Sequence, residues 1–544
     1  MDAAMPTVRR MGRDRIRWTQ SLAIVIGLVA VEWGLRFVPL PGLNTQAILA
    51  WLDSMYARVG SRSFYIGSPL AQMSIVSLGI MPYVSSAYIV QLVCVLTRRL
   101  GTPTVQEATS RRLDRATLIG AVLVGGVQAW FIAKLIDSTP LGSGHTSMVL
   151  APGLGFRLVT VCSLVAGTML LVGLARLTTR LTNVNGVVVL LAFDMAEKVF
   201  EKARSVELQG NSGATLLVVL GLGVALSVCV LRLRVPIPLC DARGNVGTPV
   251  LHAPYCPAGG APFAISLLLM DKLVVFSRSR RTAGFIGLLA TNQGLYWTAL
   301  SAVTLALAIA WPSILQFPER TAGRMRSVGL CMPTVQPGVD TEDRLRRLWW
   351  MQTLRGGAVF VALAVAISLT LGFDARLKPL QSVLSGLVIL ILVALCLDGR
   401  KALTASAAPQ ARRMPEGALP AASANGRCPA CSSELADGFA VCWSCGGAVA
   451  PISPLPAPPA IPEAPPEGGR PVTVARLAFP IDAELARLKL EAEGIPVRLL
   501  DYHIVLANWF LGVAVGGIRV QVPEECAPAA RELLFPPEPT ARAG

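Results

Sequence analysis

Residues 74–93 read SIVSLGIMPYVSSAYIVQLV, and none of these side chains is charged. An α-helix rises about 1.5 Å per residue, so a helix of about 20 predominantly apolar residues crosses the hydrocarbon core of a bilayer. The stretch has both the length and the composition of a transmembrane helix. It therefore places the chain among membrane proteins.

Nine other stretches of the chain are also apolar and poor in charge. Over all 544 residues, 53% are hydrophobic and only 15% are charged, a balance that soluble domains rarely show. Together with the stretch above, extended to 70–96, they predict an all-α polytopic membrane fold with ten transmembrane helices. The other nine lie at about 21–38, 117–136, 153–175, 186–200, 214–231, 261–277, 295–315, 357–373 and 381–397.

Few charged side chains interrupt these spans. The fifth span meets Asp194 and Glu197, and helices that face a channel interior need not be apolar all round. No coupling-ion constellation stands out, which disfavours a small-solute transporter, and no nucleophile–base or carboxylate pair indicates an enzyme. The intramembrane charges that we weigh are Arg36, Lys134, Arg157, Asp271 and Lys272.

The positive charges indicate orientation rather than nucleic-acid binding. The net charge is +16, and Lys and Arg gather beside the apolar runs, as the positive-inside rule expects. Their bias predicts cytoplasmic N- and C-termini, although the basic residues at 278–281 oppose it. No stretch interleaves basic with aromatic side chains, so DNA is not an expected partner. A secretory signal peptide is the alternative for the start, but no convincing small-residue cleavage site follows it.

The composition changes after the tenth span, and we divide the tail into four parts. Residues 401–427 form a polar tether, 428–447 hold a cysteine cluster, 448–471 form a Pro/Ala-rich linker, and 472–536 form a small α+β domain. In that domain we predict strands at 472–477, 495–500 and 517–522 and helices at 480–493 and 526–534. The Gly516–Gly517 pair is expected to make a hairpin turn or a close approach to a ligand. Asp501 and His503 are expected to be ordinary turn residues, with the histidine exposed.

The cysteine cluster has the spacing of a metal site. Cys428, Cys431, Cys442 and Cys445 form C-x2-C-x10-C-x2-C, so two knuckles can place four thiolates around one ion. We therefore expect structural zinc in a ribbon that folds only with its metal and binds a partner. A redox dithiol pair is the alternative, although a reducing cytoplasm argues against disulfides.

Several motifs, in order along the chain, resemble the SecY channel subunit of the preprotein translocase. The segment Leu78-Gly-Ile-Met-Pro-Tyr83 is followed by Gln91-Leu92 as in the second helix of that family. Further matches lie at Gly167–Leu170, at Asn185-Gly186, at Arg234–Ile237 and at Pro333–Gly338. The resemblance covers about residues 15–400. It implies a bacterial inner-membrane protein whose two five-helix halves, about 1–200 and 201–400, enclose a pore for an unfolded polypeptide.

The resemblance also implies a plug and a pore ring. A short external helix within residues 43–58 would plug the pore, with its apolar face formed by Ala47, Ile48, Trp51, Leu52 and Met55. On residue type alone, an interfacial amphipathic helix on the outer surface is the preferred interpretation of this segment, and only the neighbouring motif favours a plug. A narrow aliphatic ring dewets and blocks ions, although each of its members also fits ordinary helix packing. By motif position the ring would be Ile80, Val84, Leu191, Met195, Ile265 and Ile391.

The family further implies partners. These are small SecE- and SecG-like membrane subunits and either the SecA motor or a ribosome. The cytoplasmic docking loop before the ninth span would include Arg324, Arg326, Gln336, Pro337 and Gly338, with Gln336 where the family usually has arginine. The domain at 472–536 resembles a small, ferredoxin-like, signal-transducing bacterial domain. The chain is thus expected to conduct polypeptides, as a divergent or accessory copy; the alternative is a membrane-anchored sensor or scaffold that acts through its zinc-ribbon tail.

Overall fold

The computed structural model describes most of the N-terminal half of the chain and the C-terminal domain. The described ranges are residues 5–49, 73–96, 107–138, 140–141, 146–204, 234–241, 250–254, 318–328, 330–332, 339–352, 471–508 and 511–535, with scattered positions elsewhere between 217 and 431. The predicted seventh, eighth and ninth spans therefore lie almost wholly outside the described residues.

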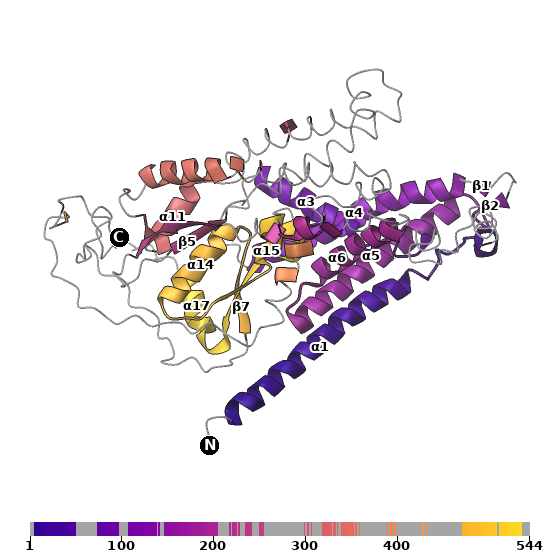
Figure 1. Ribbon diagram of the computed structural model, residues 1–544. Helices are drawn as coiled ribbons and strands as arrows, with labels where there is room; N and C mark the ends of the chain where they lie inside the picture. Colours follow the sequence, from indigo (N-terminus) through magenta and orange to yellow (C-terminus); the bar gives the residue numbers. More distant parts are fainter. Residues whose placement is uncertain are drawn as a thin grey trace, which may run out of the picture.

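Five helices correspond to the first five predicted spans. Helix α1 packs along α5 and α6, α4 packs against α3 and α5, and the five helices make one bundle (Figure 1). Within the described residues, Arg112–Ser138 and Leu154–Thr182 are long and apolar enough to cross a membrane, and Thr19–Leu35 and Met81–Cys94 are shorter apolar helices. The total of ten spans stays a prediction. The helix bounds are α1 Met5–Leu35, α3 Met81–Leu96, α4 Glu107–Ser138, α5 Leu154–Thr182 and α6 Gly186–Arg204.

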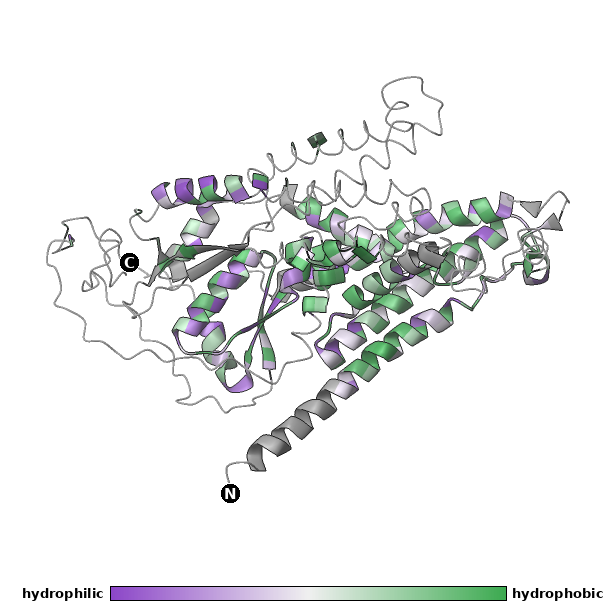
Figure 2. Ribbon diagram, viewed as in Figure 1, coloured by the Kyte–Doolittle hydropathy of each residue, from purple (hydrophilic) through white to green (hydrophobic). Residues whose placement is uncertain are grey.

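One face of α4 carries a stripe of exposed apolar side chains spaced four residues apart. All five are more than half exposed, while Ala121, Ala129 and Ala133 on the other face are buried. Side chains four apart lie on one side of a helix, so the stripe is a continuous surface suited to lipid. Figure 2 shows the same apolar character along α4 and α5. The stripe consists of Ile119, Leu123, Val127, Phe131 and Leu135.

The second predicted span is not one continuous helix. Residues 73–80 form turns, and α3 begins only at Met81. Gly79 has φ +57°, a left-handed conformation that an L side chain rarely adopts. Pro82 then occupies the first turn of α3, where its missing N–H leaves no helical hydrogen bond unmade. These residues correct the predicted span 70–96 to a turn followed by a helix.

Residues from two loops of the chain, at 234–254 and at 318–352, form a small second core. Strand β3 (Arg234–Pro238) pairs with β5 (Val250–Pro254), and β4 (Cys240–Asp241) pairs with β6 (Leu330–Cys331), both antiparallel. Helix α11 (Pro318–Val328) and the helical residues 339–352 pack on them. At the opposite end of the bundle, β1 (Pro140–Leu141) pairs with β2 (Thr146–Ser147).

The C-terminal domain is a three-stranded antiparallel sheet in the order β7–β9–β8, with α14 and α17 packed on it. The predicted α+β character is confirmed, and the strand predicted at 495–500 is observed only for its last three residues. Between β8 and β9 lie two short helices that the sequence analysis did not predict, α15 and α16. The bounds are β7 Pro471–Leu477, α14 Pro480–Ala492, β8 Arg498–Leu500, α15 Tyr502–Ala507, α16 Leu511–Val515, β9 Ile518–Pro523, η4 Glu524–Cys526 and α17 Ala527–Leu534.

Candidate functional site

The described members of the predicted pore ring lie in one apolar cluster. Ile80, Val84 and Leu191 are buried together, and Met195 is half-buried against them. Ile80 follows the Gly79 turn, and Val84 is in the first turn of α3, while Leu191 comes from α6. All four belong to the same large apolar cluster, which also includes side chains of the C-terminal domain. The other two, Ile265 and Ile391, lie outside the described residues.

Only the start of the predicted plug is described. Ile48 is buried, and Ala47 is half-buried beside it, in an apolar cluster with Phe156 of α5 and Ala129 of α4. The side chain of Asn44 accepts a hydrogen bond from the Ala47 N–H at 3.1 Å and so begins this helical turn. The remaining predicted plug residues, Trp51, Leu52 and Met55, lie outside the described residues, so the plug stays a prediction.

A cluster of four charged side chains lies next to the Gly79 turn. Arg36, just after α1, pairs with Glu32 at 3.1 Å, with Asp194 of α6 at 2.6 Å and with Glu197 of α6. A Cβ added to Gly79 would lie 2.9 Å from Asp194 Oδ2, so the turn beside Ile80 fits closely against the cluster. Three carboxylates thus share one guanidinium. The sequence signal for this cluster was the acidic Glu32 inside the otherwise apolar run 21–38.

The two unpredicted helices of the C-terminal domain lie against the transmembrane helices. Helix α16 packs mainly on α3 and also touches α4 and α6. The Tyr83 hydroxyl donates to the Ala514 carbonyl at 3.3 Å, and the Val513 N–H donates to the Gln91 side chain at 3.3 Å. The apolar side chains of α15 and α16 belong to the same cluster as Ile80, Val84 and Leu191. The signal was an almost wholly apolar run at 502–515 in a domain expected to be soluble.

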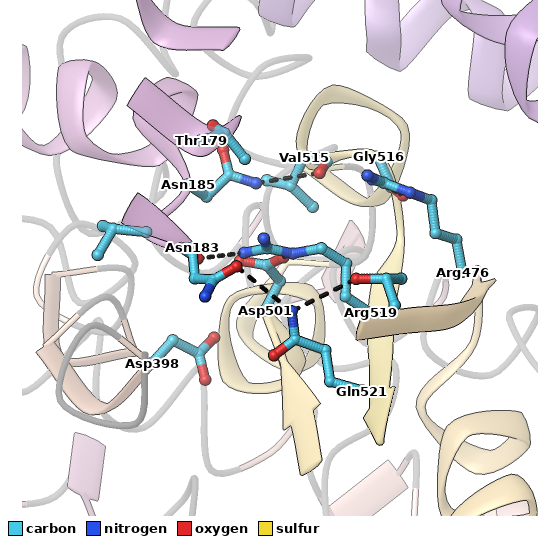
Figure 3. A network of polar contacts seen from close by, with 12 residues as sticks. Thr179, Asn183, Asn185, Asp398, Arg476, Asp501, Val515, Gly516, Arg519 and Gln521 are labelled. Carbon is cyan, nitrogen blue, oxygen red and sulfur yellow. Dashed lines mark hydrogen bonds and ion pairs between the residues drawn. The ribbon is translucent and has the colours of Figure 1, made fainter. Parts of the chain in front are cut away.

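A polar network joins the sheet of the C-terminal domain to the turn between α5 and α6 (Figure 3). Arg519 donates from Nε to Asp501 Oδ2 and from Nη2 to the Asn183 carbonyl, both at 2.6 Å. Asn185 Nδ2 donates to the Val515 carbonyl at 3.0 Å. Asn183 closes α5 in the left-handed conformation, which aims its carbonyl at Arg519. The two asparagines of the turn therefore both bind the domain.

The turn itself depends on a close backbone approach. A Cβ added to Gly186 would lie 2.2 Å from the Ala175 carbonyl oxygen of α5, so only glycine fits there. The Gly186 N–H donates to the Thr179 hydroxyl at 2.8 Å. This packing fixes the start of α6 against α5 and thereby holds Asn183 and Asn185 in place.

Asp501 and His503 are both buried, which corrects the expectation that the histidine is an exposed turn residue. Asp398, at the end of the tenth predicted span, lies with Oδ1 2.7 Å from His503 Nδ1. Its carboxylate also accepts the backbone N–H groups of His503 at 3.2 Å and Ile504 at 2.9 Å. A carboxylate at a helix N-terminus satisfies donors that have no partner within the helix. Asp398 thus caps α15 from a distant part of the chain.

Burial shifts the pKa values of two charged side chains in this network, Asp501 and Arg476. It raises the pKa of the Asp501 carboxyl above its ordinary value, and Arg519 opposes that rise. Burial and the neighbouring Arg519 charge lower the pKa of the Arg476 guanidinium, whose Nη1 donates to the Gly516 carbonyl at 3.3 Å. Gly516 and Gly517, both at φ +79°, end α16 rather than form a hairpin turn, since the Gly517 N–H donates to the Gly512 carbonyl at 2.7 Å.

The predicted docking loop contacts the C-terminal domain. Arg324 of α11 pairs with Asp482 of α14, and Leu485 and Leu488 of α14 are buried in the loop core beside Met325. The side chain of Arg326 and the residues Gln336, Pro337 and Gly338 lie outside the described part. Of the predicted zinc ligands, Cys428 is buried and Cys431 is exposed, while Cys442 and Cys445 are not described.

Comparison with known proteins gives consistent results. A sequence profile of the SecY family matches residues 74–399. The protein translocase subunit SecY of Rickettsia felis is 26% identical over 406 residues, which cover 69% of this chain and 93% of that protein. The SecY subunit of Escherichia coli K12 is 26% identical over 360 residues, which cover 62% of this chain and 81% of that protein.

Two solved structures also align with this chain. One, of a SecY protein with a plug domain, is 14% identical and has a TM-score of 0.47 over 70% of this chain and 91% of that chain. The other, of a protein-conducting channel, is 13% identical and has a TM-score of 0.45 over the same shares. These structural scores carry no part of the assignment. The family profile spans more than half of the 544 residues, and on that match the chain belongs to the SecY family.

Proposed function

We infer that this chain is the protein-conducting subunit of a translocation channel, which moves unfolded polypeptides across or into the membrane. The observation that carries the inference is the SecY match over residues 74–399 together with the joint burial of Ile80, Val84 and Leu191. Aliphatic side chains that meet at a constriction exclude water and ions, yet they part when a chain passes. No bond chemistry is needed from the protein.

The finer arrangement is also a proposal. Ten spans in two halves of five would surround the pore, with both termini on the cytoplasmic side of a bacterial plasma membrane and a plug within residues 43–58. The bias of Lys and Arg supports the orientation. SecE- and SecG-like subunits would clamp the channel. Docking of SecA or a ribosome is the least supported part, because Gln336 replaces a family arginine and Arg324 is engaged by Asp482.

The tail would carry a zinc ribbon and a ferredoxin-like domain. The support for a shared ion is the knuckle spacing of Cys428 with Cys431 and of Cys442 with Cys445. Zinc would fold the ribbon and take no part in transport. Purified protein should contain one zinc per chain, and Cys442→Ser should lose it while the protein still inserts. Wild-type protein free of zinc after purification without chelator would exclude the ribbon.

Single-channel conductance in planar bilayers tests the channel. The wild type should be closed, whereas deletion of residues 43–58 or Ile80→Asn should leak ions. Ile80→Leu keeps an aliphatic side chain of equal volume and should stay closed. Leu123→Asn, which places an amide on the lipid-facing stripe, controls for general damage. If inserted plug-deleted and Ile80→Asn channels stay silent, the chain is instead a scaffold on a SecY-like core that acts through its tail.

A further inference from the structure

The C-terminal domain, residues 471–535, binds residues from the first half of the SecY-like core. Three of its contacts are to α3: Ala514 with Tyr83, Val513 with Gln91, and Asn508 Nδ2 with the Tyr88 hydroxyl at 2.9 Å. Arg519 and Val515 add two contacts to the α5–α6 turn. Helix α16 therefore fixes the position of α3, which is the helix that carries Val84 of the predicted pore ring.

The same domain also binds residues from the second half of the core. Asp398 accepts both N–H groups at the start of α15 and pairs with the His503 side chain. On the far side of the sheet, α14 joins α11 through the Arg324–Asp482 ion pair and buries Leu485 and Leu488 beside Trp349. One folded domain is thus attached to both halves at once.

The polar groups that make these attachments are buried, so the loss of their partners would cost free energy. Four of the polar residues that make these attachments are less than a tenth exposed: Asp398, His503, Asn508 and Arg519. If the two halves separated while the domain stayed in place, these buried polar groups would lose their hydrogen-bond partners. Apolar side chains of α15 and α16 would lose their burial in the same step. Opening of the core and undocking of the domain are therefore coupled.

We propose that residues 471–535 form a clasp that holds the two halves of the channel closed, and that undocking of α15 and α16 is a required step of opening. The inference rests on the proposed channel function, because it concerns the separation of the two halves. A cytoplasmic partner that captures the apolar α15–α16 surface would open the clasp. The apolar segment 502–515 is the part that such a partner would bind.

The test is a full-length variant that breaks the interface without touching the inside of the domain. Tyr88→Phe, Gln91→Leu and Asp398→Ala together remove a hydroxyl, an amide acceptor and the cap of α15. Glu525→Ala removes a charge from the same domain at an exposed position and is the matched control. Hydrogen exchange of the peptide covering 502–515 reports undocking, and single-channel recording of the same preparation reports opening.

The triple variant should raise exchange in 502–515 and increase open probability at least tenfold over wild type, whereas Glu525→Ala should change neither. If the triple variant undocks without opening more often, while the plug-deleted protein does conduct, the clasp proposal is wrong and the channel function is retained. Silence of every variant, the plug deletion included, overturns both.

A second measurement does not depend on the fold of a weakened variant. With p-benzoyl-phenylalanine in place of Tyr88, illumination should cross-link α3 to the peptide 502–515, and the cross-linked, plug-deleted channel should conduct at least tenfold less often than the same channel kept dark. Equal conductance after complete cross-linking overturns the proposal.

Discussion

Two buried ionic sites in this molecule differ in their charge balance. Around Arg36, three carboxylates share one guanidinium, whereas Arg519 faces the single carboxylate of Asp501. Glu32 Oε2 has no hydrogen-bond partner among the described residues, although that carboxylate is 1% exposed. The first site therefore has surplus negative charge beside the predicted pore ring, and the second is a neutral pair. The comparison indicates that the first site is held together almost entirely by one side chain.

Loss of Arg36 should have the largest effect. Arg36→Leu leaves the buried carboxyl groups of Glu32 and Asp194 and the half-buried one of Glu197 without a counter-charge, and the free energy of unfolding should fall by about 3–5 kcal/mol. Unfolding by titrated SDS measures it. Arg157→Leu breaks a one-to-one pair with Asp137 that is more exposed and should cost less. Equal losses in the two variants would contradict the special role of Arg36.

Arg519→Leu should have the next largest effect, confined to the C-terminal domain. It leaves the buried Asp501 without its ion-pair partner and the Asn183 carbonyl without its hydrogen-bond donor. The free energy of unfolding of the domain should therefore fall by about 3 kcal/mol. Hydrogen exchange should rise in 498–523 and stay unchanged in α4 and α5. Arg531→Leu, on an exposed position of α17, is the control. A rise throughout the bundle would show that the two sites are not independent.

Asn185→Ala tests the neutral part of the second site. It leaves the buried Val515 carbonyl without its donor, and the domain should lose about 1 kcal/mol of docking free energy. The change in protection of 511–515 from exchange measures it. Asn185→Asp also removes the donor and should be at least as harmful, so a fully stable Asn185→Asp variant would exclude this hydrogen bond as a contributor.

The pH dependence of docking should reflect Asp501. Burial raises the folded-state pKa of this carboxyl above its unfolded value, so its stabilising contribution is fully present below the unfolded pKa and is lost as pH rises through the folded pKa. Docking measured by exchange should weaken across that window, and Asp501→Asn should remove the slope. A slope of the same size in Asp501→Asn would assign it to another group.

The smallest effect is expected when one acidic side chain of the Arg36 site is replaced by its neutral amide. Asp194→Asn keeps the size of the side chain that meets Gly79 and replaces one of the three acidic side chains that pair with Arg36. The free energy of unfolding should change by less than about 1 kcal/mol, because neutralising a surplus buried charge offsets the weaker ion pair. A loss as large as that of Arg36→Leu would show that the three carboxylates are not equivalent.

The sequence by itself determined that the chain enters the membrane, roughly where its first five long helices lie, and that strands and helices alternate in the tail. A helix satisfies the backbone hydrogen bonds of a long apolar run within that run itself, so composition and length were sufficient there. The SecY motifs also supplied the pore-ring prediction, of which Ile80, Val84, Leu191 and Met195 belong to one large apolar cluster; their role stays a prediction. These signals are local, because each lies within a short stretch of the sequence.

Only the tertiary structure decided what the tail does to the core. Asp398 and His503 are 105 residues apart, and Asn183 and Arg519 are 336 apart, so no local pattern relates them. The run 502–515 is too short to span a membrane and looked like an ordinary part of a soluble domain. The role of this segment depends on the surface against which it is buried, and that surface is formed by residues far away in the sequence.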